Sequence, residues 1–377
     1  MAEKIWLSSP HMGGREQVFV NEAFDSNWVA PLGPNVTGFE QDLETYLGND
    51  SFVGALSSGT AAIHLALILS GVEAGDEVIC QSFTFSASAN PIRYLGAIPI
   101  FVDSERETWN MCPETLEEAI KDRISKGKKP RAIIAVHLYG MPFKADKIQA
   151  VAKKYDIPII EDSAEALGST LNGQKCGTFG DIGILSFNGN KIITTSGGGA
   201  IVTKTAILKD KAIFLATQAR DQAPHYQHSE IGYNYRLSNI CAGIGRGQME
   251  VLDKHIKLRR GMHDFYLDYF SKIDGVTVFN EPNQNYFSNH WLSAITMDSD
   301  NGKSVEGLRL ALEAQNIESR PLWKPMHLQP VFSPFPSYET GVSQLLFETG
   351  LCLPSGSNLE EIHKKRIGEV FDDYFLL

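Results

Sequence analysis

Residues 53–69 have the sequence VGALSSGTAAIHLALIL, which predicts a short strand, a turn of small residues and then a helix. Ser58, Gly59 and Thr60 are good N-cap and turn residues, so we expect the helix to begin there. The same alternation continues along the chain, with buried strands expected at 77–81, 98–103, 131–136 and 157–161. Short β-branched strands that alternate with helices are typical of an α/β fold with a mainly parallel sheet covered on both faces.

The chain length of 377 residues exceeds what one hydrophobic core usually supports, so we expect two domains. We place a large domain at residues 1–250 and a small C-terminal domain at residues 251–377. The stretch 245–272 predicts one long helix that connects them. Beyond it, a strand expected at 291–297 and a helix expected at 304–315 indicate that the small domain is α+β.

The charge and the cysteine content argue against several classes of protein. With a formal net charge of −11 and no run of Lys or Arg, the chain is not expected to bind nucleic acid. The sequence lacks the run of about 20 apolar residues that a membrane helix needs, and residues 1–10 lack the apolar core of a signal peptide. The five cysteines are scattered without a CxxC pair, which argues against disulfides or a metal site and favours the cytoplasm.

The segment 180–203, GDIGILSFNGNKIITTSGGGAIVT, places Lys191 between apolar, strand-like runs. Burial disfavours the charged form of a lysine, and a neutral amine is what Schiff-base chemistry requires. The glycines at 197–199 allow close backbone approach or unusual dihedral angles beside it. The same pattern also fits an exposed lysine at a turn, and the residue types alone leave both interpretations open.

Two further segments carry residues that could bind a phosphorylated ring. Asp162, in IIEDSAEALGS (159–169), follows a buried strand, where its carboxylate could hold a proton on a pyridine nitrogen or could instead cap a helix. In SSGTAA (57–62), the N–H groups at the start of the helix favour phosphate binding. Small-residue turns before helices are common, so the informative feature is the order of phosphate turn, aspartate and lysine.

Together with other motifs, these segments make the chain resemble the DegT/DnrJ/EryC1/StrS family of sugar aminotransferases. The resemblance runs from about residue 5 to 356, and its motifs are APLGPNVTGFEQDLETYLG (30–48), ALSSGTAAIHLAL (55–67), SFTFSASANPIRYLGAIPIFVD (82–103), IIEDSAEALGS (159–169), LSFNGNKIITTSGGGAIV (185–202), GYNYRLSNICAGIG (232–245) and SRPLWKPMH (319–327). It implies a fold-type I pyridoxal-phosphate enzyme, with a large domain on a mainly parallel sheet and a smaller C-terminal domain. The cofactor it implies is pyridoxal 5'-phosphate, which becomes pyridoxamine phosphate during the reaction.

The resemblance implies roles for individual residues. Lys191 would form the Schiff base with the cofactor and later carry protons, and Asp162 would pair with the pyridine nitrogen. Phe85 would stack on the ring. The expected cofactor contacts also include Ser58, Gly59, Thr60, Glu165, Ser186, Asn188, Asn234 and Arg236.

Several of these positions carry more specific implications. Asn234 and Arg236 correspond to residues that reach the phosphate of a neighbouring subunit, which implies a homodimer with shared active sites. Arg320 and His327 correspond to positions near the sugar nucleotide. Glu165 departs from the family pattern, because many relatives carry His or Gln there, and an ionised carboxylate beside the phenolic oxygen of the cofactor would be unfavourable.

The implied reaction moves an amino group from L-glutamate to a keto-sugar carried by a nucleotide. The motifs SSPHMGG (8–14), NGNKIITTSGGG (188–199) and RPLWKPMH (320–327) are most similar to those of bacterial enzymes that aminate C4 of UDP-linked 4-keto-6-deoxy-N-acetylhexosamines, for surface glycans or glycoconjugates. A C3 aminotransferase and a GDP-sugar 4-aminotransferase of the same fold are alternatives, since these motifs do not decide which carbon is aminated.

Two other classes fit the motifs less well. Cofactor-dependent sugar dehydratases resemble the chain but carry histidine in place of Lys191. A non-catalytic relative would be favoured by the loss of Lys191, Asp162 or the phosphate turn, and the chain retains all three.

Overall fold

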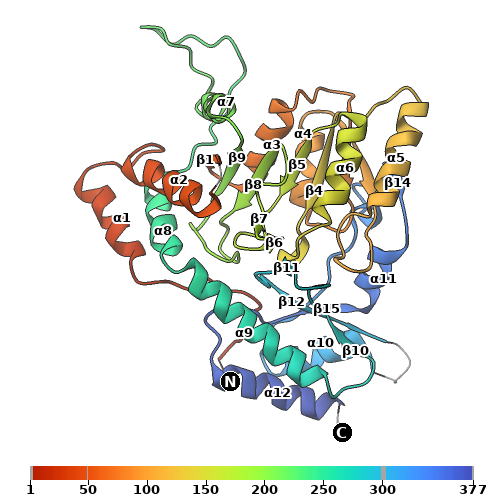
Figure 1. Ribbon diagram of the computed structural model, residues 1–377. Coiled ribbons are helices and arrows are strands. Elements are labelled where there is room, and N and C mark those ends of the chain that lie inside the picture. The colour runs from red at the N-terminus through yellow and green to blue at the C-terminus, as the bar shows by residue number, and fades with distance from the viewer. Residues whose placement is uncertain (1–2, 49, 299–302, 376–377) are drawn as a thin grey trace.

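The computed structural model describes residues 3–48, 50–298 and 303–375 (Figure 1). Its large sheet has eight strands. All neighbouring strands run parallel except at β9, which is antiparallel to both of its neighbours. The prediction of a mainly parallel sheet is therefore confirmed. In spatial order the strands are β1 (Phe52–Leu56), β9 (Gly199–Thr203), β8 (Ile182–Ser186), β5 (Ile159–Asp162), β4 (Ala132–Val136), β2 (Glu77–Gln81), β3 (Ile98–Val102) and β14 (Ser337–Tyr338).

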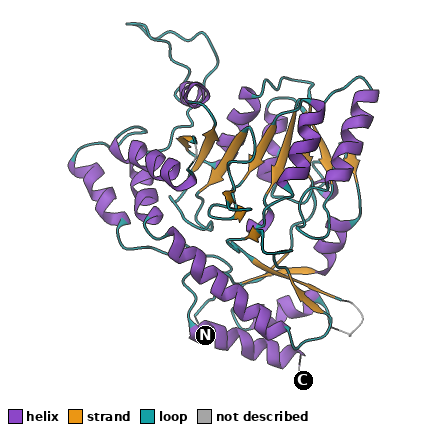
Figure 2. Cartoon of the chain, viewed as in Figure 1, coloured by secondary structure: helices purple, strands orange, loops and turns teal. Residues whose placement is uncertain are grey.

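Helices cover both faces of this sheet, which explains why the middle positions of its strands are mostly apolar (Figure 2). In β4, Ala132 and Ile134 belong to one buried cluster, whereas Ile133 and Ala135 belong to another on the opposite face. Successive side chains of a strand point to opposite faces, so a strand that is covered on both sides is apolar at positions of both parities. The helices of the first cluster are α3 (Gly59–Leu69), α4 (Asn90–Tyr94) and α7 (Ala206–Ala216), and those of the second are α5 (Pro113–Ser125) and α6 (Ala145–Tyr155).

The prediction of one long helix at 245–272 is wrong, because two helices occupy this stretch. Helix α8 (Asn239–Met249) ends just before Val251, and α9 (Leu252–Phe270) begins after it. Val251 has φ −118° and ψ 5°, outside the helical region. Its side chain packs on the backbone of Gly13, where an added Cβ would lie 2.8 Å from both valine methyls. The apolar pattern continues through the break, so the sequence does not reveal it.

The C-terminal part of the chain forms a smaller antiparallel sheet with its own core. Its strands are, in order, β10 (Val276–Val278), β12 (Ser293–Met297), β15 (Gly350–Leu353) and β13 (Arg320–Pro321). They pack with α9, α10 (Val305–Ala314) and α12 (Glu361–Phe375). The remaining elements of this description are α1 (Glu16–Asp25), α2 (Pro34–Leu47), α11 (Val342–Thr349) and a three-stranded sheet of β11 (Tyr286–Phe287), β6 (Thr170–Leu171) and β7 (Gln174–Lys175).

The chain crosses between its two parts at both ends, so the division at residue 250 stays a prediction. Strand β14 comes from the C-terminal part yet extends the large sheet beside β3. In the other direction, the N-terminal strap, which we define as residues 5–11, runs to the small sheet: Ile5 pairs with Ile317, and Leu7 accepts a hydrogen bond from the N–H of Ser355 at 2.8 Å. None of the described helices combines the length and apolar character needed to cross a bilayer.

Two buried histidines make the stability of the fold sensitive to acid. The rings of His263 in α9 and His290 before β12 stack with centroids 3.5 Å apart. Burial, reinforced by His290, lowers the pKa of His263 to about 3. The unfolded chain, with an ordinary pKa near 6.5, therefore binds protons more readily, and stability is lost as the pH falls from the unfolded pKa towards the folded one. We expect His263 to cost about 2 kcal/mol of unfolding free energy between pH 7.5 and 5.0.

Urea unfolding of the wild type and of His263→Phe at the two pH values measures this cost. Phenylalanine keeps a planar ring beside His290 but has no proton to bind, so the variant should lose less stability on acidification. Equal losses in both proteins would contradict the prediction.

Candidate active site

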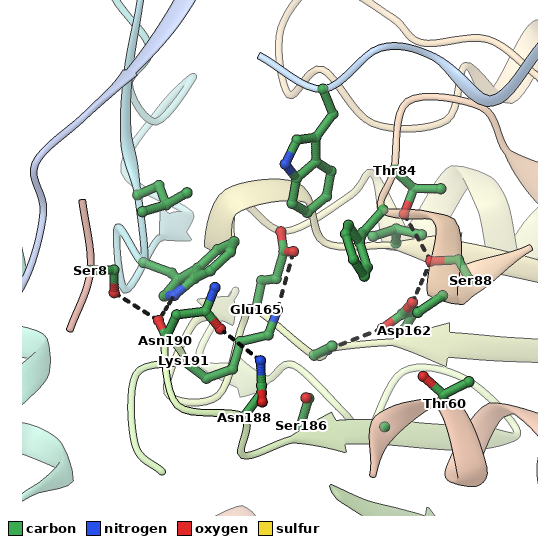
Figure 3. A pocket seen from close by; sticks show the side chains of 18 of the residues that line it. Ser8, Thr60, Thr84, Ser88, Asp162, Glu165, Ser186, Asn188, Asn190 and Lys191 are labelled. Atoms are coloured by element: carbon green, nitrogen blue, oxygen red, sulfur yellow. Dashed lines mark hydrogen bonds and ion pairs between the residues drawn. The ribbon is translucent and has the colours of Figure 1, made fainter. Parts of the chain in front are cut away.

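A cavity of about 530 Å³ lies at the carboxyl ends of β4, β5 and β8 (Figure 3). Such strand ends are where open α/β sheets bind ligands. Its walls also include Trp291 and Trp323 from the C-terminal part of the chain. The predicted site residues that line it are Ser58, Gly59, Thr60, Phe85, Asp162, Glu165, Ser186, Asn188, Lys191 and Arg320.

Lys191 points into this cavity from the loop between β8 and β9, so it is not an exposed lysine at a turn. Its side chain is 12% exposed. The amine Nζ lies 3.4 Å from Oε1 of Glu165 and 4.2 Å from the ring centroid of Trp291. A lysine held between a carboxyl group and an aromatic face is positioned to react with a molecule in the cavity.

The backbone beside Lys191 is held by residues that the sequence patterns did not indicate. The carbonyl of Asn190 accepts hydrogen bonds from Ser8 Oγ at 2.7 Å and from Trp291 Nε1 at 2.6 Å. The buried Arg259 donates to the carbonyls of Trp291 at 2.7 Å and Lys191 at 3.4 Å. Fixed backbone atoms on both sides of a peptide limit where the lysine side chain can reach. Ser8 belongs to the motif SSPHMGG, but nothing local links it to a lysine far along the chain.

Asp162 ends β5 with its carboxylate buried at the cavity wall. Oδ2 accepts a hydrogen bond from Ser88 Oγ at 2.7 Å, and Oδ1 accepts one from the N–H of Ala164 at 3.1 Å. A turn follows the strand where the alternative interpretation expected a helix, so Asp162 is not a helix N-cap. Ser88, which itself bonds to Thr84 at 2.8 Å, is a further residue that sequence reasoning missed.

A cradle with room for a phosphate lies at the N-terminus of α3. Ser58 caps the helix as predicted, with its Oγ accepting from the N–H of Ala61 at 3.0 Å. The first turn of a helix directs free N–H groups outward and favours an anion. Two close approaches shape the cradle: an added Cβ at Gly59 would lie 3.1 Å from Ser186 Cβ, and one at Gly199 would lie 2.4 Å from the nitrogen of Gly59. The glycines after Lys191 therefore include one required for close approach.

Three other predicted residues also line the cavity and are more exposed to solvent than Lys191 and Asp162. Phe85 is 56% exposed and its ring lies 5.6 Å from that of Trp323. The amide of Asn188 donates to the side chain of Asn190 at 3.3 Å. Arg320 is exposed and pairs with Glu318 at 2.8 Å. An exposed cation whose only described ion pair is with a neighbouring glutamate can exchange that partner for a substrate anion at little cost.

Asn234, Arg236 and His327 do not line the cavity of their own chain. Asn234 forms a β-bridge in the loop that follows α7, and Arg236 pairs with Glu40 at 2.5 Å. His327 is buried, with Nδ1 2.7 Å from Ser82 Oγ. The roles implied for Asn234 and Arg236 belong to a neighbouring subunit, so they stay predictions, as does the contact of His327 with substrate.

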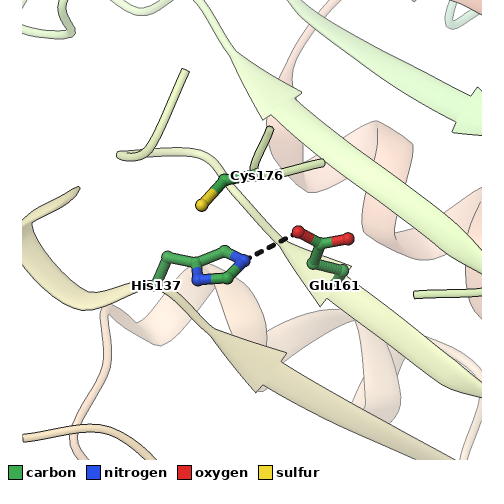
Figure 4. Close-up of side chains that lie close together, drawn as sticks. All are labelled: His137, Glu161 and Cys176. Atoms are coloured by element: carbon green, nitrogen blue, oxygen red, sulfur yellow. Dashed lines mark hydrogen bonds and ion pairs between the residues drawn. The ribbon is translucent and has the colours of Figure 1, made fainter. Parts of the chain in front are cut away.

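One cluster outside the cavity has metal-ligand residue types among the described residues (Figure 4). His137 Nε2 lies 2.7 Å from Oε1 of Glu161, beside the thiol of Cys176. Because His137 Nδ1 accepts the N–H of Phe143 at 3.0 Å, Nε2 must carry the proton and donate it to Glu161. Burial, and secondarily Glu161, raises the pKa of the Cys176 thiol, which disfavours the thiolate that a metal would need. The hydrogen bonds thus explain the cluster, and the predicted lack of a metal site stays a prediction.

Comparison with known proteins places this geometry in a family. The DegT/DnrJ/EryC1/StrS aminotransferase family matches residues 10–372. EpsN of Bacillus subtilis (strain 168), a proposed pyridoxal phosphate-dependent aminotransferase, is 52% identical over 98% of this chain and 95% of its own. The GDP-perosamine synthase of Escherichia coli O157:H7 is 36% identical over 98% of both chains.

Solved structures agree with this assignment. Spr1654 of Streptococcus pneumoniae, a proposed sugar aminotransferase whose structure is known in forms with pyridoxal phosphate and pyridoxamine phosphate, superposes in the first form with a TM-score of 0.89. The superposition covers 99% of each chain at 26% sequence identity. The match over nearly the whole chain shows that it belongs to the DegT/DnrJ/EryC1/StrS aminotransferase family, whose members are pyridoxal phosphate-dependent sugar aminotransferases.

Proposed function

We propose that this enzyme transfers the amino group of L-glutamate to the C4 ketone of UDP-4-keto-6-deoxy-N-acetylhexosamine. The observation that carries the proposal is that an amine, a buried strand-end carboxylate and a helix N-terminus line one cavity in a member of this family. The choice of a UDP-linked 4-keto sugar is supported by the resemblance of three motifs, which include RPLWKPMH at 320–327.

The groups that line the cavity fit pyridoxal phosphate. The phosphate would be held by Ser58–Thr60 at the start of α3 and by Ser186, in the cradle that a Cβ at Gly59 would narrow. The ring nitrogen would pair with Asp162, and the aldehyde carbon would react with Nζ of Lys191. When bound, the cofactor supplies the electron sink that makes removal of a proton from the amino-bearing carbon possible.

The chain contributes proton transfer, orientation and exclusion of water. Nζ of Lys191 would take a proton from one carbon and return it to another. The Asp162 carboxylate, which is fixed by Ser88 and Ala164, would orient the ring and favour a protonated nitrogen. The indole rings of Trp291 and Trp323 form apolar walls that limit the access of water to the reacting atoms.

We further propose that the enzyme works as a homodimer with shared sites. The loop that follows α7 extends away from the body of the molecule (Figure 1), and Asn234 at its end pairs with Thr217 at its start. Within this loop Tyr226 is 78% exposed and Ile231 is 82% exposed. Large apolar side chains left in solvent on a projecting loop suit contact with another protein surface, here a second copy.

A second candidate substrate is a GDP-linked 4-keto-6-deoxy sugar, which the similarity to a GDP-perosamine synthase favours. A substrate panel distinguishes the two. The purified enzyme, supplied with pyridoxal phosphate and L-glutamate, is incubated with UDP- and GDP-linked 4-keto-6-deoxy sugars and with a UDP-linked 3-keto sugar. Products are identified by mass spectrometry, and the aminated carbon is located by NMR.

We expect amination at C4 of the UDP-linked N-acetylhexosamine, with a kcat/KM at least about tenfold above that for the GDP-linked sugar, a difference of about 1.4 kcal/mol in transition-state binding. Preferential turnover of the GDP-linked sugar would show that the second candidate is the substrate. Amination at C3 would overturn the proposed regiochemistry. A protein that takes up no pyridoxal phosphate would overturn the reaction altogether.

A further inference from the structure

Glu165 is held so that one carboxylate oxygen faces the amine of Lys191. Its Oε2 accepts the N–H of Tyr139 at 2.7 Å, and its Oε1 lies 3.4 Å from Lys191 Nζ. Its own backbone carbonyl accepts from Asn289 Nδ2 at 2.9 Å. The side chain is only 4% exposed. The carboxyl group therefore has a fixed position in which Oε1 is directed at the reacting nitrogen (Figure 3).

The surroundings of Glu165 leave its protonation state finely balanced. The titratable groups that face it are Lys191, Asp162, Tyr139 and Cys352. Burial raises the pKa of Glu165 to about 7, against the opposing effect of Lys191 and with a smaller contribution from Asp162 in the same direction. Lys191 is the one cation in this set. Near neutral pH the carboxyl group can therefore either give or receive a proton.

We propose that Glu165 and Lys191 form one acid–base couple, in which the carboxyl group takes the proton that the amine must lose before it reacts. In this step an N–H bond of the Lys191 ammonium breaks and an O–H bond forms on Oε1 of Glu165. The pair remains neutral in total, and no other reactant is needed. The assignment deepens the proposed function and rests on Lys191 being the amine that binds the cofactor.

A purely structural ion pair would have the same contact but a different response to pH. If Glu165 stayed ionised throughout, the amount of neutral amine would rise tenfold per pH unit for as long as most of the amine is still protonated. In a couple that exchanges one proton, the rise stops once Glu165 begins to ionise. Above that pH, the neutral amine comes from transfer within the pair, and the fraction of neutral amine stays constant until the pair loses its last proton.

The experiment measures the reactivity of Lys191 in the full chain after its cofactor has been removed with hydroxylamine and dialysis. Initial rates of acetylation are followed by peptide mass spectrometry from pH 5.5 to 9.5. The exposed Lys365 in the same sample serves as the internal reference, which corrects for hydrolysis of the reagent. Wild type is compared with Glu165→Gln and with Glu165→Leu. Glu318→Gln is the matched control, because Glu318 also lines the cavity but bonds to Arg320 and to the N–H of Leu7.

We expect the wild type and Glu318→Gln to show a plateau that begins near pH 7. The Glu165 variants should follow the wild type below about pH 6, where its carboxyl is protonated, and should continue to rise above pH 7. By pH 8.5 they should react about tenfold faster than the wild type. Curves without a plateau in the wild type, or with a constant offset between wild type and variants, would overturn the couple.

The outcome is separable from that of the proposed function. A plateau in a protein that never binds pyridoxal phosphate would retain the proton exchange between Glu165 and Lys191 and overturn the reaction that it is proposed to serve. A protein that binds the cofactor and aminates the sugar, yet shows no plateau, would retain the reaction and overturn the couple. The wild-type curve alone decides the question if neither variant at position 165 folds.

Discussion

Lys191→Ala should lower kcat/KM by about 10³-fold or more and should remove the visible absorption band of the lysine-linked cofactor. The reason is that Lys191 is the one lysine among the described residues that line the cavity. In the proposed mechanism its amine performs both the covalent attachment of the cofactor and the proton transfer between carbons. Absorbance spectra and steady-state turnover with L-glutamate and the keto-sugar measure the two losses separately.

The matched control for this substitution is Lys365→Ala, which removes an equally long side chain from a position on α12 that is 78% exposed. That variant should keep the absorption band and turnover. Uptake of the cofactor by Lys191→Ala, measured by fluorescence quenching, should persist in weakened form because the phosphate cradle and Asp162 remain. The assignment fails if Lys191→Ala retains the lysine-linked band, or retains more than a tenth of wild-type turnover.

The second large effect is expected for Asp162→Asn, which should lower kcat by about 10²–10³-fold. The amide has nearly the same shape, so Ser88 can still donate to its oxygen, but it lacks the negative charge that favours a proton on the ring nitrogen. Since that charge matters most when the ring accepts electrons, the loss should fall on kcat more than on the KM for either substrate. Stopped-flow measurement of the half-reaction with L-glutamate tests this division.

Ser88→Ala provides a graded comparison, because it removes the hydrogen bond to Oδ2 and leaves the charge in place. Its kcat should lie between those of the wild type and Asp162→Asn. A near-normal half-reaction in Asp162→Asn, or a larger loss in Ser88→Ala than in Asp162→Asn, would show that the carboxylate does not act through its charge.

The sequence predicts the large sheet well because its strands are short apolar runs that end at polar residues or turns. The strand expected at 77–81 matches the bounds of β2, in which the apolar Val78, Ile79 and Cys80 lie between the polar Glu77 and Gln81. The helix after the small-residue turn begins at Gly59, where Ser58 supplies the cap. The break between α8 and α9 was missed because the apolar pattern continues through it, and the nearby Gly245 and Gly247 lie inside α8 and do not mark its end.

A residue of the site was predictable only where the local sequence determines the position of that residue. Asp162 ends a strand and Ser58 starts a helix, so both have positions that a pattern can give. Arg259 has no such signal, because its partners Trp291 and Ser355 are brought to it only by the folded small sheet. The same holds for the contact between Glu165 and Lys191, which lie 26 residues apart on different loops. Motifs identify the candidate residues of a site, and tertiary packing decides which of these residues are in contact.

The N-terminal strap has a consequence for the order in which the enzyme can mature on the ribosome. Residues 5–11 are translated long before the residues that they contact, since Ile5 pairs with Ile317 and Leu7 with Ser355. Because Leu7 and Ser8 also form part of the cavity wall, a nascent chain cannot enclose a substrate before those late residues are available. The wall of the cavity is therefore completed only after residues 317 and 355 have been translated.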